Sequence, residues 1–175
     1  MTSSIVSAAA EALPFGDASS HGITVAQAFH WFDSPAAMRE FHRVLRPGGK
    51  LAVFWNQRRI GESDLLREYE ALIDGFFGVR RRSKNVRSFE EELSGAGGFS
   101  DLTEATMRWE DETTVDAFVG FARTPSYVRN ALDAVQLADY SAAVRSIGAR
   151  YAEGRAGGAR LRIPYETVLF TAERE

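Results

Sequence analysis

The sequence predicts an α/β fold in which a mainly parallel sheet is covered by helices. Two apolar runs have the pattern of buried parallel strands, namely 22–29, which is rich in β-branched residues, and 50–55. Between them, residues 33–45 have apolar side chains at helical spacing, so a helix supplies the crossover that two parallel strands require. Helical and strand-like segments continue to alternate along the chain, as in an open α/β sheet.

The N-terminal part predicts one short strand, a loop and a capped helix. Residues 5–9 form a short apolar run, and residues 13–20 are rich in the turn formers Pro, Gly, Asp and Ser. In the helix that follows, Asp33 or Ser34 occupies the cap position and Pro35 the first turn. The expected core face of this helix consists of Ala37, Met38, Phe41, Val44 and Leu45.

The middle of the chain predicts two helices followed by a strand. Apolar residues recur at helical spacing over residues 63–77. Ser88 and Glu91 have the spacing of a capping box, which predicts a short helix that ends at a glycine-rich turn. Residues 102–109 then predict a strand.

The C-terminal part predicts two more helical stretches and a long final strand. Thr113 or Thr114 caps the first stretch, and Pro125 separates it from the second. Residues 154–160 are expected to form a loop, and residues 162–173 alternate as a long strand does.

Composition excludes several classes of protein. The chain has 175 residues, a formal net charge of −3 and no cysteine. Disulfides, thiolate metal sites and cysteine nucleophiles are therefore excluded, and neither nucleic acid nor an anionic membrane is an expected partner. The first 15 residues carry no basic side chain and contain Glu11 and Pro14, so they predict neither a signal peptide nor a membrane span. A cytoplasmic location is expected.

One long segment carries a family resemblance. The stretch ALPFGDASSHGITVAQAFHWFDSPAAMREFHRVLRPGGKLAVFWN resembles the middle of type 11 methyltransferases, in the subgroup with an AFHWF motif that is related to trans-aconitate methyltransferases, and the later FARTPSYV stretch is also similar. The resemblance implies methyl transfer from S-adenosylmethionine (SAM) to a small-molecule acceptor. It implies a single truncated domain over residues 1–175, a partial Rossmann-like class I sheet from the end of the third strand through the seventh. Acceptor choice would reside in lid-like regions at about residues 57–87 and 123–158.

The same resemblance implies site residues. Two segments would hold the cofactor, namely Ala10, Glu11 and Ala12 beside the adenine and Ala26, Gln27 and Ala28 beside the methionine part. His30 is the implied catalytic residue, as the one near-neutral general base in the crevice. Phe29 and Trp31, together with Ser126 and Tyr127 in the lid, would line the substrate pocket. An aromatic face here would hold the sulfonium cation by about 0.5–2 kcal/mol.

Each of these residue types also fits a structural role. His30 and Trp31 fit packed core residues equally well, and Ser126 and Tyr127 fit a turn after Pro125. The glycines at 48–49 are typical of a helix stop and tight turn rather than a phosphate loop. The basic run at residues 80–87 fits a solvated loop, or a contact with an anionic substrate or RNA.

The resemblance also implies that two parts of the usual cofactor site are absent. On its alignment Met1 falls where the third strand is already running, so the glycine-rich cofactor loop and the acidic residue that binds the ribose would be missing. Losing two charge-assisted hydrogen bonds, at about 1.5–3 kcal/mol each, would weaken SAM binding by about two to four powers of ten. It would also leave strand 22–29 at an exposed edge. A homo-oligomer or partner chain, folding back of the N-terminal residues, or a start codon assigned too late would each account for this edge.

Two further function classes therefore stay open beside the enzyme. The chain would be a non-catalytic remnant or a subunit needing a separate N-terminal half, or else a small module for ligand binding or oligomerisation.

Overall fold

A computed structural model describes residues 5–78, 91–92, 95, 97–155 and 158–175 of the chain. The chain divides into two compact units. The first unit comprises residues 1–56, 82–107 and 167–175, and the second comprises residues 57–81 and 108–166.

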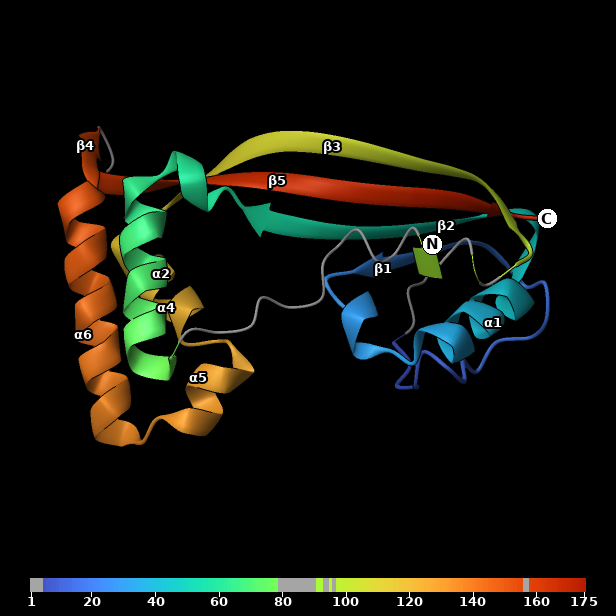
Figure 1. Cartoon of the computed structure of the whole chain (residues 1–175), viewed down its shortest axis with the longest axis horizontal. Helices are drawn as coiled ribbons and strands as arrows, with labels where there is room; N and C mark the ends of the chain where they lie inside the picture. The colour runs from blue at the N-terminus through green and yellow to red at the C-terminus, as the bar shows by residue number, and fades with distance from the viewer. Residues whose placement is uncertain (1–4, 79–90, 93–94, 96, 156–157) are drawn as a thin grey trace. The chain divides into compact units, whose positions relative to one another are not determined.

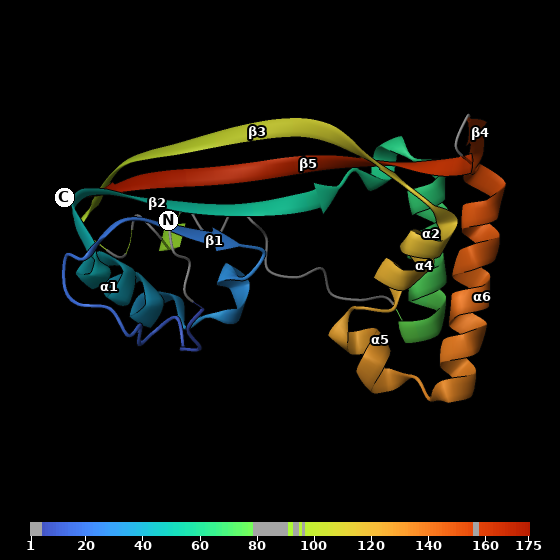
Figure 2. The same ribbon diagram turned by 180° about the vertical axis from the view of Figure 1, so that it is seen from behind.

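The first unit is built on a strand, helix, strand arrangement. Strand β1 (Ser20–Ala26) pairs in parallel with β2 (Leu45–Arg58), and helix α1 (Ser34–Val44) makes the crossover. Strands β3 (Phe99–Thr113) and β5 (Gly158–Arg174) complete the order β1-β2-β5-β3. In both views α1 lies on one side of β1 and β2 (Figures 1 and 2). The predicted parallel unit is therefore confirmed.

Helix α1 begins and packs as its sequence predicts. The side chain of Asp33 accepts a hydrogen bond from the backbone N–H of Ala36, and Pro35 lies in the first turn, where its missing N–H costs nothing. The expected core face is buried, with Ala37, Met38, Phe41, Val44 and Leu45 each at most 2% exposed. The core of the first unit is formed where this face meets β1, β2 and β5.

Two predictions about the N-terminal region are wrong. Residues 5–8 form no strand, and Ile5 is fully exposed. Residues 22–29 are not a strand buried on both faces, because β1 ends at Ala26 and Val25 is its one buried residue. The physical reason is that β1 lies at the end of the described strand order, so neighbours cover only part of it. The loop predicted over residues 13–20 is confirmed as far as Ser19.

The second unit consists of packed helices and the ends of long strands. Its helices are α2 (Asp64–Phe77), α4 (Val115–Ala122), α5 (Ser126–Ala131) and α6 (Ala134–Tyr151). Thr114, one of the two predicted cap residues, caps α4, whereas the cap of α2 by Ser63 and the capping box of Asp133 and Gln136 that starts α6 were not predicted. The helix expected from the capping box at Ser88 and Glu91 lies largely outside the described residues, as does the basic run at residues 80–87.

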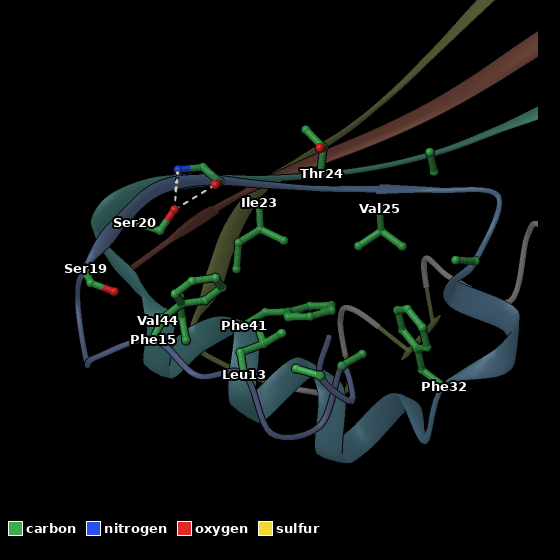
Figure 3. Close-up of a pocket in the computed structure, with 15 residues that line it drawn as sticks. Leu13, Phe15, Ser19, Ser20, Ile23, Thr24, Val25, Phe32, Phe41 and Val44 are labelled. Carbon is green, nitrogen blue, oxygen red and sulfur yellow. Dashed lines mark hydrogen bonds between the residues drawn. The ribbon is translucent and has the colours of Figure 1, made fainter. Parts of the chain in front are cut away.

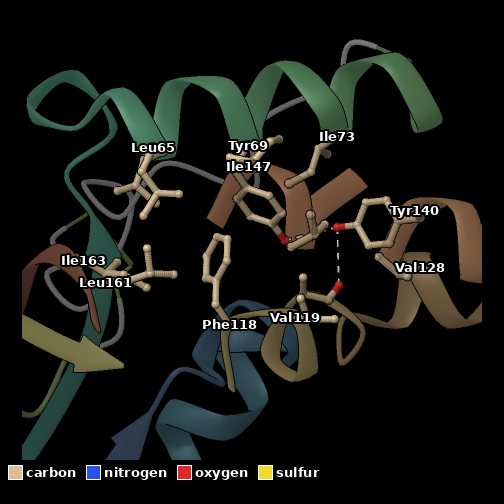
Figure 4. Packing of buried hydrophobic residues seen from close by; sticks show 13 residues of the cluster. Leu65, Tyr69, Ile73, Phe118, Val119, Val128, Tyr140, Ile147, Leu161 and Ile163 are labelled. Carbon is tan, nitrogen blue, oxygen red and sulfur yellow. Dashed lines mark hydrogen bonds between the residues drawn. The ribbon is translucent and has the colours of Figure 1, made fainter. Parts of the chain in front are cut away.

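A pair of tyrosines occupies the centre of this helical core. The hydroxyls of Tyr69 and Tyr140 are 3.1 Å apart, and Tyr140 donates to the carbonyl oxygen of Ala122 at 3.4 Å (Figure 4). Because a hydroxyl has one proton, Tyr69 is then the donor to Tyr140. Burial, followed by the hydrogen bond with Tyr69, raises the pKa of Tyr140.

The long C-terminal strand contributes to the cores of both units. Leu161 and Ile163 of β5 are buried in the second unit, whereas Val168, Phe170 and Ala172 are buried in the first. The loop expected at residues 154–160 is instead partly an antiparallel hairpin, in which β4 (Glu153–Arg155) pairs with the start of β5. In the described part of the chain, every helix is too short or too polar to cross a membrane.

We expect the exchange Tyr140→Phe to destabilise the fold by about 1–3 kcal/mol, because the buried Tyr69 hydroxyl then loses its acceptor. Tyr69→Phe is the matched control, since it leaves the Tyr140 bond to Ala122 in place and should cost less. Urea unfolding measures both free energies. Equal stability of Tyr140→Phe and the native chain would contradict the role given to this pair.

Candidate functional site

The carboxyl ends of β1 and β2 are joined by hydrogen bonds of Gln27 to Phe54 and Asn56, and these residues are called the corner below. Gln27, directly after β1, has a φ of 55°, a left-handed conformation that is uncommon for residues other than glycine. Its backbone N–H donates to the Phe54 carbonyl at 3.0 Å, and its side-chain amide donates to the Asn56 carbonyl at 3.1 Å. Such conformations persist where surrounding bonds determine them, and they cluster at functional sites.

A short 3-10 turn, Phe29–Trp31, follows this corner. Phe29 is 2% exposed and packs edge-on against Phe32 at 5.9 Å, so it anchors the turn in the core. His30 and Trp31 are exposed, with Trp31 76% accessible. The indole nitrogen of Trp55 donates to Nδ1 of His30 at 3.5 Å. Phe29, expected in the substrate pocket, is thus a core residue, and the core role left open for His30 and Trp31 is wrong because both side chains are exposed.

The first segment expected to hold the cofactor is joined to the residue that follows the AFHWF motif. Residues 9–12 form a tight turn in which the N–H of Ala12 donates to the carbonyl of Ala9 at 3.1 Å. The Glu11 carboxylate accepts a hydrogen bond of 2.9 Å from the backbone N–H of Asp33, the cap residue of α1. This bond joins the Ala10–Ala12 segment to the end of the AFHWF motif.

An ionic cluster fixes the loop between these segments to α1. Glu40 accepts the N–H of Leu13 at 2.7 Å and two bonds from the Arg43 guanidinium at 2.7 and 2.8 Å. Arg43 also donates to Asp17 at 2.6 Å. The hydrogen bonds from Arg43, chiefly, hold the pKa of Glu40 at about 2, well below its usual value. Only 12% of the Glu40 side chain is exposed, so this cluster is a structural clamp.

A cavity of about 740 Å³ lies under β1 in this unit. Figure 3 shows Ile23 and Val25 directed into it toward Phe41 of α1, whereas Thr24 is directed away. Among the expected cofactor residues, Ala10, Ala26 and Ala28 line it, but Glu11, Ala12 and Gln27 do not. Its remaining walls are mostly apolar and carry no charged side chain among those described. Cavities of this size and polarity typically accept small organic ligands.

Two expected pocket residues belong to the second unit. Ser126 is the first residue of α5 and is exposed. The ring of Tyr127 packs edge-on against Phe77 at 5.2 Å and contributes to that unit's core. Their contact with a substrate stays a prediction. Within the residues that the structure describes, no group of three His, Cys, Asp or Glu side chains is placed to bind a metal.

Three residues that shape this site were not predicted from the sequence. Trp55 and Asn56 lie at the carboxyl end of β2, a position at which parallel strands commonly present ligand-binding groups, so their place in the chain was a usable signal. Glu40 has the three-residue spacing to Arg43 that permits an ion pair on one helix face. Its bond to Leu13 had no comparable signal, because it joins residues 27 apart.

Comparisons with known proteins agree with this arrangement. The model of a methyltransferase domain family matches residues 2–53, which include the corner, the 3-10 turn and α1. An uncharacterized methyltransferase of Mycobacterium bovis is 29% identical over 165 residues, covering 93% of this chain and 62% of the relative. The chain therefore spans less than two thirds of the length of that relative. A methyltransferase-like protein of Schizosaccharomyces pombe is 49% identical over 49 residues, covering 28% of this chain and 19% of the relative.

Solved structures share the fold. A protein of Anaeromyxobacter dehalogenans assigned as a type II methyltransferase has a TM-score of 0.55 and 23% identity. The match covers 95% of this chain and 69% of the chain of that protein. A Bacillus halodurans protein assigned as a methyltransferase has a TM-score of 0.50 and 18% identity. The match covers 97% of this chain and 76% of the chain of that protein. The chain thus has the mixed α/β, Rossmann-like fold that these structures share. Its residues 2–53 are similar in sequence to a methyltransferase domain family.

We expect Glu40→Gln to loosen the clamp and lower stability near neutral pH. The pKa of Glu40 is lowered on folding, so its charge stabilises the fold above the ordinary value of 4.5 and loses this effect as pH falls toward about 2. The difference in unfolding free energy between the native chain and Glu40→Gln should therefore shrink over that range. Glu62→Gln, which alters an exposed pair with Arg59, is the control with a small expected effect. A difference that does not depend on pH would contradict the clamp.

Proposed function

We propose that this chain takes part in methyl transfer from SAM to a small-molecule acceptor, and that the corner after β1 is its part of the site. The observation that carries the proposal is the bond between Glu11 and Asp33, which brings residues 9–12 beside the AFHWF motif. Both segments lie within the residues that the methyltransferase family model matches. The subgroup related to trans-aconitate methyltransferases, and with it the identity of the acceptor, stays a prediction.

The residues of the corner are compatible with SAM. Ala10, Ala26 and Ala28 are small and border the apolar cavity, which suits the flat, weakly polar adenine. The indole of Trp31 is exposed beside them in sequence and offers a π face to a cation such as a sulfonium. The described lining contains no charged partner for the amino-acid end of SAM, so other groups would have to hold that end.

In this proposal the protein mainly aligns the reactants. SAM supplies a methyl group on a positively charged sulfur, and transfer is a direct displacement by the acceptor. Alignment in this case means holding the acceptor in line with that methyl, which can contribute most of the rate acceleration. The left-handed conformation of Gln27, held by its hydrogen bond to Asn56, fixes the direction in which the chain leaves β1. It therefore also fixes where His30 and Trp31 lie. We propose that these two side chains contact the acceptor.

Calorimetric titration of the folded chain with SAM and with its demethylated product tests cofactor binding. We expect binding by the native chain, and its loss in Ala10→Phe, because the larger ring would occupy part of the cavity that Ala10 lines. Ala105→Phe, the same exchange at an exposed position of β3, is the control and should bind as the native chain does. A folded native chain that binds neither compound would refute the proposal that this chain holds SAM.

A second candidate function is favoured by the edge of β1. This strand lies at the end of the described strand order, is mostly exposed, and has the apolar cavity beneath it. Exposed strand edges of this kind pair readily with other chains. In this alternative the chain is a subunit or oligomerising module, and a second copy or a partner chain covers β1.

Sedimentation velocity tests the oligomeric form of this alternative. We expect the native chain to self-associate, and Thr24→Lys to reduce association, because a charge on the edge strand disfavours further pairing. Thr106→Lys, on the exposed strand β3, is the control that should leave association unchanged. A native chain that sediments as a strict monomer would exclude the oligomer.

A further inference from the structure

The hydrogen bond between Trp55 and His30 has a consequence for the chemistry of the imidazole. Trp55 lies near the end of β2, is 7% exposed, and is held edge-on to Phe170 at 6.2 Å. From this fixed position its indole nitrogen donates to Nδ1 of His30 at 3.5 Å, a weak hydrogen bond that is longer than usual for an N–H donor. His30 itself is on the exposed side of the 3-10 turn.

The direction of this bond determines which imidazole nitrogen carries the proton. An indole N–H can only donate, so Nδ1 of His30 must be the acceptor. A neutral imidazole has one donor and one acceptor nitrogen, and its proton therefore lies on Nε2. A proton on Nδ1 would place two N–H groups facing each other and break the bond.

Nε2 is the nitrogen left available to a ligand. Within the described part of the chain it has no hydrogen-bond partner, and the nearest ring contact of His30 is Trp31, with centroids 5.1 Å apart. The exposed face of the turn therefore combines an N–H donor with an adjacent aromatic surface. A neutral His30 that already carries its proton on Nε2 has no free lone pair at that nitrogen with which to remove a proton.

We propose that Trp55 is a positioning residue that holds His30 as a hydrogen-bond donor through Nε2. Resting on the proposed function, this means that His30 binds an oxygen of the methyl acceptor and does not act as the general base expected from the sequence. The site would then suit an acceptor whose nucleophilic oxygen is already ionised, such as a carboxylate, because such a group needs no base. Donation to an anionic oxygen is also the stronger kind of hydrogen bond.

Nitrogen-15 NMR of the full chain, at a pH where its histidines are neutral, measures the tautomer directly. In the native chain we expect His30 to give the signals of a ring protonated on Nε2, assigned by their absence from His30→Ala. In Trp55→Phe, which keeps an aromatic ring in the core but removes the donor, the proton should distribute over both nitrogens. Trp109→Phe, which removes an indole stacked on Tyr165 in the second unit, should leave His30 unchanged.

A second signal keeps the test decisive if Trp55→Phe does not fold. The indole N–H resonance of Trp55 should shift in His30→Ala, because its acceptor is lost, while that of Trp109 stays in place. A native His30 protonated on Nδ1, or a Trp55 resonance unmoved by His30→Ala, would overturn the proposal. Neither measurement requires cofactor, so failure of SAM to bind and failure of this inference are separate results.

Discussion

The parallel pairing of β1 with β2 is the constraint on which the rest of the site depends. Parallel strands place their carboxyl ends at the same edge of a sheet, so Gln27 and Asn56 meet although they are 29 residues apart in sequence. Helix α1 makes this pairing possible, and its buried face fills the space beneath both strands. The left-handed turn at Gln27, the 3-10 turn after it and the bond between Trp55 and His30 all follow from that common edge.

Polar contacts, in addition to the apolar core, fix the loop that lines the cavity. The backbone N–H of Leu13 is half-buried and pairs with Glu40, whose charge is balanced by Arg43. A donor left without a partner at this depth would cost about 1–3 kcal/mol, so the clamp both satisfies the loop and fixes its position. The loop in turn forms one wall of the cavity, through Leu13 and Phe15. The shape of the apolar cavity therefore depends on an ionic cluster outside it.

The sequence predicted local elements well where a single signal controlled them. Asp33 and Thr114 each cap a helix, because a short polar side chain can satisfy free N–H groups of its own first turn. Long-range placement was harder to predict. The apolar run at residues 5–9 fits a strand as far as composition goes, but it has no partner strand in the described structure and stays irregular. Phe29 continues the apolar run of β1, yet the turn at Gln27 ends that strand and directs the ring into the core.

The candidate site also combines features set by local sequence with features set by long-range packing. By its own content the sequence determined the alternation of strands and helices, the capped helix α1, and the AFHWF segment that carries the family resemblance, because these depend on neighbouring residues and their spacing. The tertiary structure decided which of the expected residues line the cavity, that Glu11 bonds to Asp33, and that Trp55 faces His30. The physical reason is that such contacts join residues more than 20 positions apart, and their geometry is set by the packing of a whole sheet and helix rather than by any local preference of the chain.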